Sequence, residues 1–127
     1  MTENKKENLN NRMIKFLFEG APVRGACVQM AEEWQEMIKF HHYPENVAAL
    51  LGQFTAGALL LSSTIKFEGS LILQVKGSGP IAFIYAEVRN PMSVRAMAEI
   101  REGAEIKPEM DLQELINKDG KGLCALI

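Results

Sequence analysis

Apolar residues dominate one stretch of the chain, VAALLGQFTAGALLLSSTIKF, which covers residues 47–67. Its first fifteen residues include only two plainly polar side chains, Gln53 and Thr55, and no charged one. A membrane span needs about 20 predominantly apolar residues, and no one-sided cluster of lysine and arginine flanks this run. We therefore predict a helix buried in the core of a globular domain, from about Pro44 to Thr64.

Small residues recur every four positions along this predicted helix. They form two rows, Ala48, Gly52 and Ala56 in one and Ala49, Gln53 and Gly57 in the other. A glycine inside a helix costs about 1 kcal/mol relative to alanine, so close packing against another layer should offset that cost. Because apolar side chains occupy almost the whole circumference, we expect the helix to be covered on several sides.

Alternating apolar and polar residues predict strands on both sides of this helix. The expected strands cover residues 13–18, 23–30, 71–76, 81–88, 92–100 and 122–127. The first two should pair across the turn at Gly20–Pro22, and a second turn at Gly77–Pro80 should join two of the later strands.

Two short helices are also expected. Apolar residues recur at helical spacing just before the long helix, and these are Ala31, Trp34, Met37 and Ile38. This spacing predicts a short amphipathic helix that ends before Pro44, because the residue preceding a proline is disfavoured in the α region. Pro44 then suits the first position of the long helix. Near the C-terminus, Asp111 should cap a helix that carries Leu115 and Ile116.

These elements predict an α+β fold in which antiparallel sheet layers pack around a buried central helix, a β/α/β arrangement preceded by the short amphipathic helix. A length of 127 residues fits one domain. We expect residues 1–12 to form a disordered polar tail and residues 13–127 to form the domain. Because the last predicted strand is apolar to its end, we expect a truncated domain with an unpaired edge, and therefore an oligomer or a strand-exchanged dimer.

Composition narrows the classes of function. Apolar residues make up 47% and charged residues 24% of the chain, which is typical of a globular protein. A net charge of −2 gives no electrostatic reason to expect nucleic-acid binding. The polar N-terminus lacks the apolar run of a secretory signal, so we expect a cytoplasmic protein. In that compartment Cys27 and Cys124 should be two buried thiols, and with no CxxC motif or adjacent histidine neither is expected to bind a metal.

Few residues offer recognisable chemistry. His41 and His42 are adjacent, but no cluster with metal-ligand spacing accompanies them, so we interpret them as solvated residues at a helix end. The Gly77–Pro80 segment lacks the GKS or GKT ending of a phosphate loop and is interpreted as a hairpin turn. Ser62–Thr64 has no neighbouring base, so its hydroxyls are expected to bond back to the helix.

Two further groups are interpreted as structural. Three glutamates, Glu32, Glu33 and Glu36, fall on the wet face of the short helix. Four of the seven methionines offer an adaptable binding surface in principle, but core filling is favoured for most. These four are Met30, Met37, Met92 and Met97. No catalytic constellation emerges.

Two segments carry a family signature. They are FLFEGAPVRGACVQM at 16–30 and HHYPENVAALLGQFTAGALLLSSTIKFEGSLILQVKGSGPI at 41–81, with Arg95–Ala96 and the turn near Gly120 also in place. In this order they resemble the N-terminal part of the bacterial redox-regulated holdase chaperones, the thirty-three-kilodalton heat-shock protein family. Each motif is weak alone, but their order and spacing from about Ile14 onward make the match specific.

The resemblance implies an ATP-independent holdase that binds unfolding client proteins under oxidative and heat stress. It implies four cysteines in a C-terminal domain that hold zinc when reduced and form disulfides when oxidised, which unfolds that domain and a linker. It also implies that the oxidised protein dimerises. Cys27 and Cys124 match none of these four cysteines, so the zinc site, the linker and the switch are expected beyond residue 127, and no cofactor is expected in the present chain.

Two alternative functions stay open. One is a small enzyme with a cleft between helix and sheet, near Arg24, Glu68 and Arg95, although no nucleophile–base or metal set can be assembled from these residues. The other is a dimerisation module without affinity for unfolded protein. The client-binding surface is not identified by the sequence.

Overall fold

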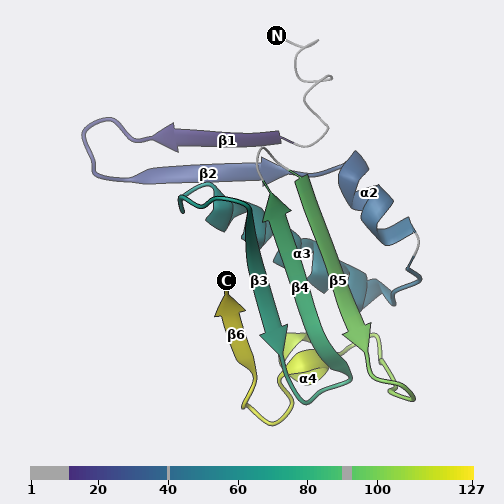
Figure 1. Ribbon diagram of the computed structural model, residues 1–127. Coiled ribbons are helices and arrows are strands. Elements are labelled where there is room, and N and C mark those ends of the chain that lie inside the picture. The colour runs from purple at the N-terminus through teal and green to yellow at the C-terminus, as the bar shows by residue number, and fades with distance from the viewer. Residues whose placement is uncertain (1–11, 40, 90–92) are drawn as a thin grey trace.

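A computed structural model describes residues 12–39, 41–89 and 93–127 of the chain (Figure 1). In chain order its elements are β1 (Arg12–Leu17), β2 (Arg24–Gln29), α2 (Glu32–Lys39), α3 (Glu45–Ser62), β3 (Ser70–Lys76), β4 (Ile81–Arg89), β5 (Ser93–Ile100), α4 (Leu112–Ile116) and β6 (Leu123–Leu126). Each predicted strand is present, with ends that differ by at most one residue. Most of the predicted tail and Met92 lie outside the described residues.

The strands form two antiparallel sheets. Strands β1 and β2 pair across the predicted turn as a two-stranded hairpin. The other four form a sheet in the order β5–β4–β3–β6. In Figure 1 the hairpin extends to the left above this sheet, and α3 lies behind the sheet. The predicted α+β class with antiparallel sheets packed on a helix is confirmed.

Helix α3 occupies the centre of the core and contacts β2, β3, β4 and β5. Its buried residues follow a helical stripe and are Val47, Leu51, Thr55, Ala58 and Leu59. Thr55 is the polar member of this stripe, and its hydroxyl donates to the Leu51 carbonyl at 2.7 Å, so no buried donor is left unpaired there. Ala49 and Gln53 are exposed on another line of the helix, so its cover is broad but not complete.

Local chemistry sets the ends of α3. Pro44 precedes the helix as its N-cap, with an extended ψ of 152°, and Glu45 is the first helical residue. The prediction of Pro44 at the first helical position is therefore one residue early. Among the described residues, no helix combines the length and the apolar character needed to cross a membrane.

The two predicted rows of small residues behave differently. A Cβ atom on Gly52 would lie 3.3 Å from the indole ring of Trp34, so the first row does permit close approach of α2. Nothing lies within 4 Å of the corresponding position on Gly57. The expectation of close packing is thus correct for Gly52 and wrong for Gly57, because no layer covers that side of the helix.

The turn at Gly77–Pro80 joins β3 to β4, as predicted, and also receives α4. A Cβ atom on Gly77 or Gly79 would collide with the carbonyl groups of Ile116 and Leu115. Asp111 caps α4 as predicted, since its carboxylate accepts from the Glu114 amide at 3.0 Å. The glycines therefore serve the seating of α4 as well as the turn.

Candidate functional site

The edge of the four-stranded sheet at β6 is the first exposed feature. Among the described strands β6 pairs with β3 alone. Ile72 and Ile127 exchange two backbone hydrogen bonds, of 2.9 and 2.8 Å. Because such pairs alternate along an antiparallel ladder, the backbone groups of Cys124 and Leu126 point away from β3. The predicted unpaired edge is thus present among the described strands.

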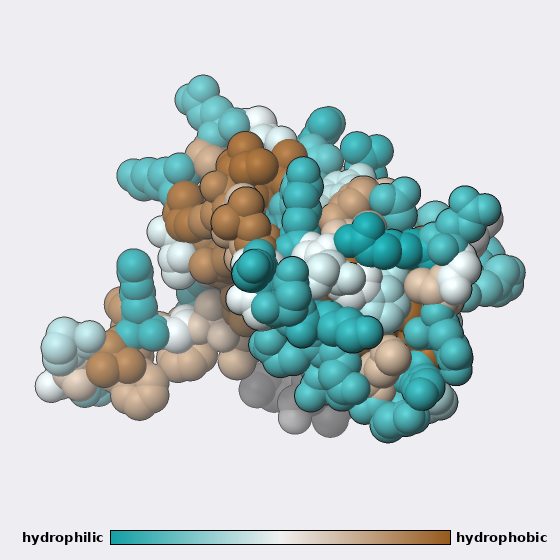
Figure 2. Space-filling view, turned by 90° about the horizontal axis from the view of Figure 1, so that it is seen from below, coloured by the Kyte–Doolittle hydropathy of each residue, from teal (hydrophilic) through white to brown (hydrophobic). Residues whose placement is uncertain are grey.

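This edge is also apolar. Leu123 is 67% exposed and Ile127 is 68% exposed, and Leu126 lies between them with 46% of its surface exposed. Figure 2 shows hydrophobic side chains gathered on the side of the molecule where β6 forms the sheet edge. Unpaired backbone groups beside exposed apolar side chains favour the addition of another strand.

The β1–β2 hairpin is the second exposed apolar feature. Side chains alternate between its two faces, and the outward face carries large apolar residues that are 41–56% exposed, namely Ile14, Phe16, Phe18 and Val23. The Phe16 ring lies over the backbone of Gly25, where a Cβ atom would collide with it. Only the start of the inward face, at Met13 and Val28, packs on the core.

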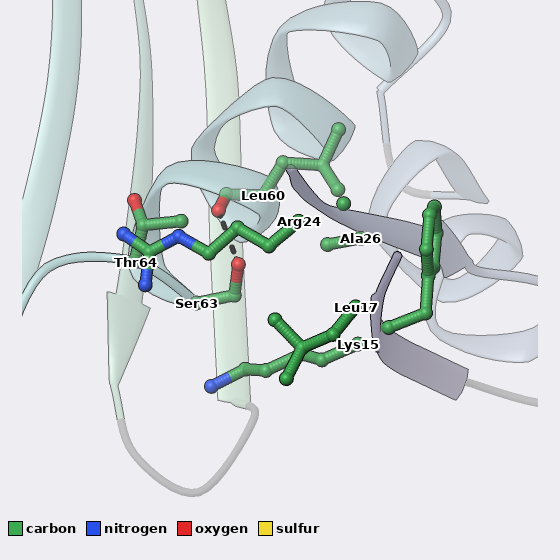
Figure 3. A pocket seen from close by; sticks show the side chains of 9 residues that line it. Lys15, Leu17, Arg24, Ala26, Leu60, Ser63 and Thr64 are labelled. Atoms are coloured by element: carbon green, nitrogen blue, oxygen red, sulfur yellow. Dashed lines mark hydrogen bonds between the residues drawn. The ribbon is translucent and has the colours of Figure 1, made fainter. Parts of the chain in front are cut away.

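The β1–β2 hairpin and the C-terminal end of α3 border a groove of about 740 Å³. Figure 3 shows the residues that line it. They are Lys15, Phe16, Leu17, Arg24, Gly25, Ala26, Leu60, Ser63 and Thr64. Leu17 is 79% exposed, which is the largest exposed fraction among the described large apolar residues.

Two cations face the end of the helix across this groove. Lys15 and Arg24 lie on the same inward face of the hairpin, and neither forms an ion pair among the described residues. The last turn of α3 contains no basic residue. Its terminal carbonyls instead accept from hydroxyls, including Ser63 to Leu60 at 2.6 Å, which confirms the predicted back-bonding of Ser62–Thr64.

A third cluster lies on the face of the four-stranded sheet that points away from α3. The Glu87 carboxylate accepts from Arg89 at 3.1 Å and from Arg95 at 3.3 Å. These hydrogen bonds, first that of Arg89 and then that of Arg95, hold the pKa of Glu87 below its ordinary value against the opposing effect of burial. The arrangement satisfies a buried carboxylate and leaves both arginines largely exposed.

The structure does not bring Arg24, Glu68 and Arg95 into one site. Arg24 lines the groove beside α3, whereas Arg95 pairs with Glu87 on the far face of the sheet. Glu68 is exposed in the loop after α3 and lines neither feature. The alternative of a small enzyme therefore gains no support from these three residues.

Both thiols are free and exposed, so the predicted burial of Cys27 and Cys124 is wrong. Cys27 faces outward on a two-stranded hairpin without a covering layer, and Cys124 lies on the edge strand β6. Neither location has enough neighbouring chain to bury a side chain. The exposure of Cys27 could not be read from the sequence, because it depends on whether another layer covers the hairpin, whereas that of Cys124 agrees with the predicted unpaired edge.

The remaining candidates lie either on the surface or against the core. His41 and His42 are exposed, and His41 stacks on Tyr43 with ring centres 5.3 Å apart. Met30 and Met37 pack against the core, as predicted. Glu36 lies on the exposed face of α2, while the side chains of Glu32 and Glu33 lie outside the described set. Within the described ranges no three potential metal ligands come together.

The described residues thus define an α+β domain whose exposed features are apolar strands and a cationic groove. The Hsp33 protein family matches residues 11–127, and the chain belongs to this family. It is 36% identical to a 33 kDa chaperonin of Chromobacterium violaceum over 94% of the chain and 40% of that relative. It is 36% and 38% identical to 33 kDa chaperonins of Shewanella woodyi and Neisseria gonorrhoeae, in each case over 89% of the chain and 37% of the relative. The chain therefore spans about two fifths of the length of these relatives.

Proposed function

We propose that the chain binds unfolding polypeptides as part of an ATP-independent holdase chaperone. The observation that carries the proposal is the concentration of exposed large apolar residues on two strand elements, the β1–β2 hairpin and the β6 edge. Exposed apolar patches bind other proteins, and a free strand edge pairs with an extended chain irrespective of its sequence. These properties suit clients that have lost their own fold. The proposed activity is binding, without a catalytic step, in the cytoplasm.

We further propose that residues 13–127 form the N-terminal part of the core domain of such a chaperone. Redox regulation and zinc binding then belong to segments that the present chain does not contain. The described residues do not fit a zinc site, because Cys27 and Cys124 lie in different sheets and no cluster of ligands surrounds either. Binding by this chain should therefore not require an oxidant.

An aggregation assay tests the proposal. A heat-unfolding enzyme is followed by light scattering with and without the 127-residue chain, before and after peroxide treatment. We expect suppression of scattering at ratios near one chain per client, with the same efficiency in both redox states. An inert globular protein of the same mass is the control. Absence of suppression at a tenfold excess of the chain would contradict the proposal.

The β6 edge also supports a proposed homodimer or strand-exchanged oligomer. Two copies that pair edge to edge would satisfy the backbone groups of Cys124 and Leu126 and cover Leu123 and Ile127. The same surface would then be shared between self-association and client binding. A dimer without any affinity for unfolded protein would instead favour the dimerisation module.

A further inference from the structure

We propose that the groove between the β1–β2 hairpin and the end of α3 selects extended polypeptide segments in which a carboxylate side chain stands beside a large apolar one. This inference rests on the proposed function and deepens it, because it names the kind of client segment and the residues that read it. Lys15 and Arg24 would bind the carboxylate, and Leu17 with Leu60 would contact the apolar side chain.

The charge balance of the groove favours an anion. Lys15 and Arg24 contribute two positive charges, and no acidic residue is among the groove's described lining residues. The C-terminal end of a helix carries roughly half a negative charge, which compensates only part of this. Hydroxyls of Ser63 and Thr64 already occupy carbonyls of that end. The remaining field is positive, so a carboxylate is the complementary group.

The spacing of the two components matches an extended chain. Lys15 and Leu17 are two residues apart on one face of β1, and Arg24 lies opposite Leu17 in the register of the hairpin. Alternate side chains of an extended segment recur with the same spacing as those of β1. A segment laid along β1 can therefore place a carboxylate at the cations and an apolar side chain at Leu17. Figure 3 shows the Lys15, Leu17 and Arg24 side chains on the same open side of the groove, with Arg24 directed toward Thr64.

The exposure of Leu17 points to an occupant. A leucine that is 79% exposed between two cations gains apolar contact only when something enters the groove. The cations flank it and would disfavour a purely apolar or basic segment. An acidic and apolar segment satisfies both conditions at once.

Two peptides test the inference. They share the same alternating apolar residues, and the intervening positions are glutamate in one and lysine in the other. Binding of each labelled peptide to the 127-residue chain is measured by fluorescence anisotropy. We expect the acidic peptide to bind about tenfold more tightly at low salt and to lose most of this preference in 1 M salt, because exposed charges are then screened.

A charge-reversed variant, Lys15→Glu with Arg24→Glu, should invert the preference so that the basic peptide binds more tightly. Lys118→Glu, a change of an exposed lysine outside the groove, is the matched control and should leave the preference unchanged. Leu17→Gln should weaken both peptides by a similar factor. Circular dichroism and thermal unfolding confirm that the variants are folded, as expected for side chains that are exposed in the native protein.

The outcomes separate this inference from the proposed function. If the chain suppresses aggregation but both peptides bind equally well to the unaltered and the charge-reversed protein, the groove inference is wrong and the chaperone proposal stands. If neither peptide binds, the groove inference is also wrong. Tight binding of vesicles with anionic headgroups, abolished by the charge reversal while the acidic peptide stays unbound, would assign the groove to a lipid surface and overturn the inference.

Discussion

Gly77 and Gly79 lie where the end of α4 meets the β3–β4 turn, and the carbonyl groups of Ile116 and Leu115 occupy the space that a Cβ atom would need. Arg101 fixes the same turn from another direction, since its side chain donates to the carbonyls of both glycines. These contacts join segments that are distant in the chain. A methyl group added at Gly77 or Gly79 would therefore disturb the β3–β4 turn, α4 and the contacts of Arg101 together.

Gly77→Ala should destabilise the protein by about 1–3 kcal/mol, the usual cost of forcing an extra methyl group into a filled space. Gly57→Ala is the matched control, because that position is open and alanine is favoured over glycine in a helix by about 1 kcal/mol. Urea denaturation measures both changes. Equal effects of the two substitutions would contradict the described seating of α4.

Glu87 makes the stability of the folded sheet depend on pH. Because its pKa is lowered from 4.5 by the hydrogen bonds of Arg89 and Arg95, the folded state binds fewer protons than the unfolded state just below that pH. The stabilisation is therefore complete above about pH 4.5 and is lost as the pH falls through the lower pKa of the folded protein.

Glu87→Gln should remove this contribution. The difference in unfolding free energy between the native protein and the variant should be largest at neutral pH and should shrink on acidification, as measured by denaturation at a series of pH values. Glu99→Gln removes an exposed carboxyl from the same sheet but keeps Glu87. The pH dependence that Glu87 gives to the unfolding free energy should therefore remain in this control variant. A difference that grows toward low pH would contradict the assigned hydrogen bonds.

Among the elements, β6 combines a paired edge with a free one. The amide of Cys124 points to the free edge, so its removal spares the ladder with β3. Cys124→Ser keeps the amide and removes only the thiol. A substitution that removes the outward amide of Cys124 can therefore be compared with one that removes only its thiol.

Cys124→Pro should shift the proposed dimer to monomer, because proline removes the outward amide and blocks pairing at a strand edge. Cys124→Ser should leave the dimer intact. Light scattering after gel filtration at several concentrations measures the mass of each. A native chain that is monomeric at high concentration would contradict self-association through β6.

The sequence predicts the existence and type of the elements well, because each carries its own period. The alternation in residues 71–76 and 81–88 and the turn between them identify the β3–β4 hairpin, and the capping residue Asp111 locates α4. Contacts between elements that are distant in the sequence could not be predicted in this way. The seating of α4 on Gly77, the approach of Trp34 to Gly52 and the pairing of β6 with β3 leave no local pattern in the sequence.

The candidate site was predictable only in part for the same reason. The apolar end of the chain indicated an exposed edge, but the groove depends on how the hairpin lies against α3. Lys15, Leu17 and Arg24 each look like ordinary strand residues. Only alternation along both strands of the hairpin could have placed them on one face. That the two cations have no ion-pair partner among the described residues could be seen only in the tertiary structure.

At the scale of the whole molecule, stability should be uneven. The four-stranded sheet packs on α3, whereas the hairpin has two strands and exposes apolar residues on both faces. Two-stranded hairpins are marginally stable without a covering layer, and weakly packed units open at lower free energy than the core.

Amide hydrogen exchange should therefore be fastest in β1 and β2 and slowest in β4, which is paired on both sides and buried. Mass spectrometry of peptides from exchanged protein measures this order. Within the hairpin, residues near Met13 and Val28 should exchange more slowly than those near Leu17, because only the former pack on the core. Equal protection of the hairpin and β4 would show that the hairpin is covered in solution.

The order β5–β4–β3–β6 has a consequence for biosynthesis. Strand β3 is complete at Lys76, but its second neighbour begins only at Leu123. At a translation rate of about 5–20 residues per second, one side of β3 emerges from the ribosome roughly 2–10 s before its partner exists. During that interval this edge of β3 in the nascent chain has no partner strand. It can then pair wrongly with a strand of a neighbouring nascent chain.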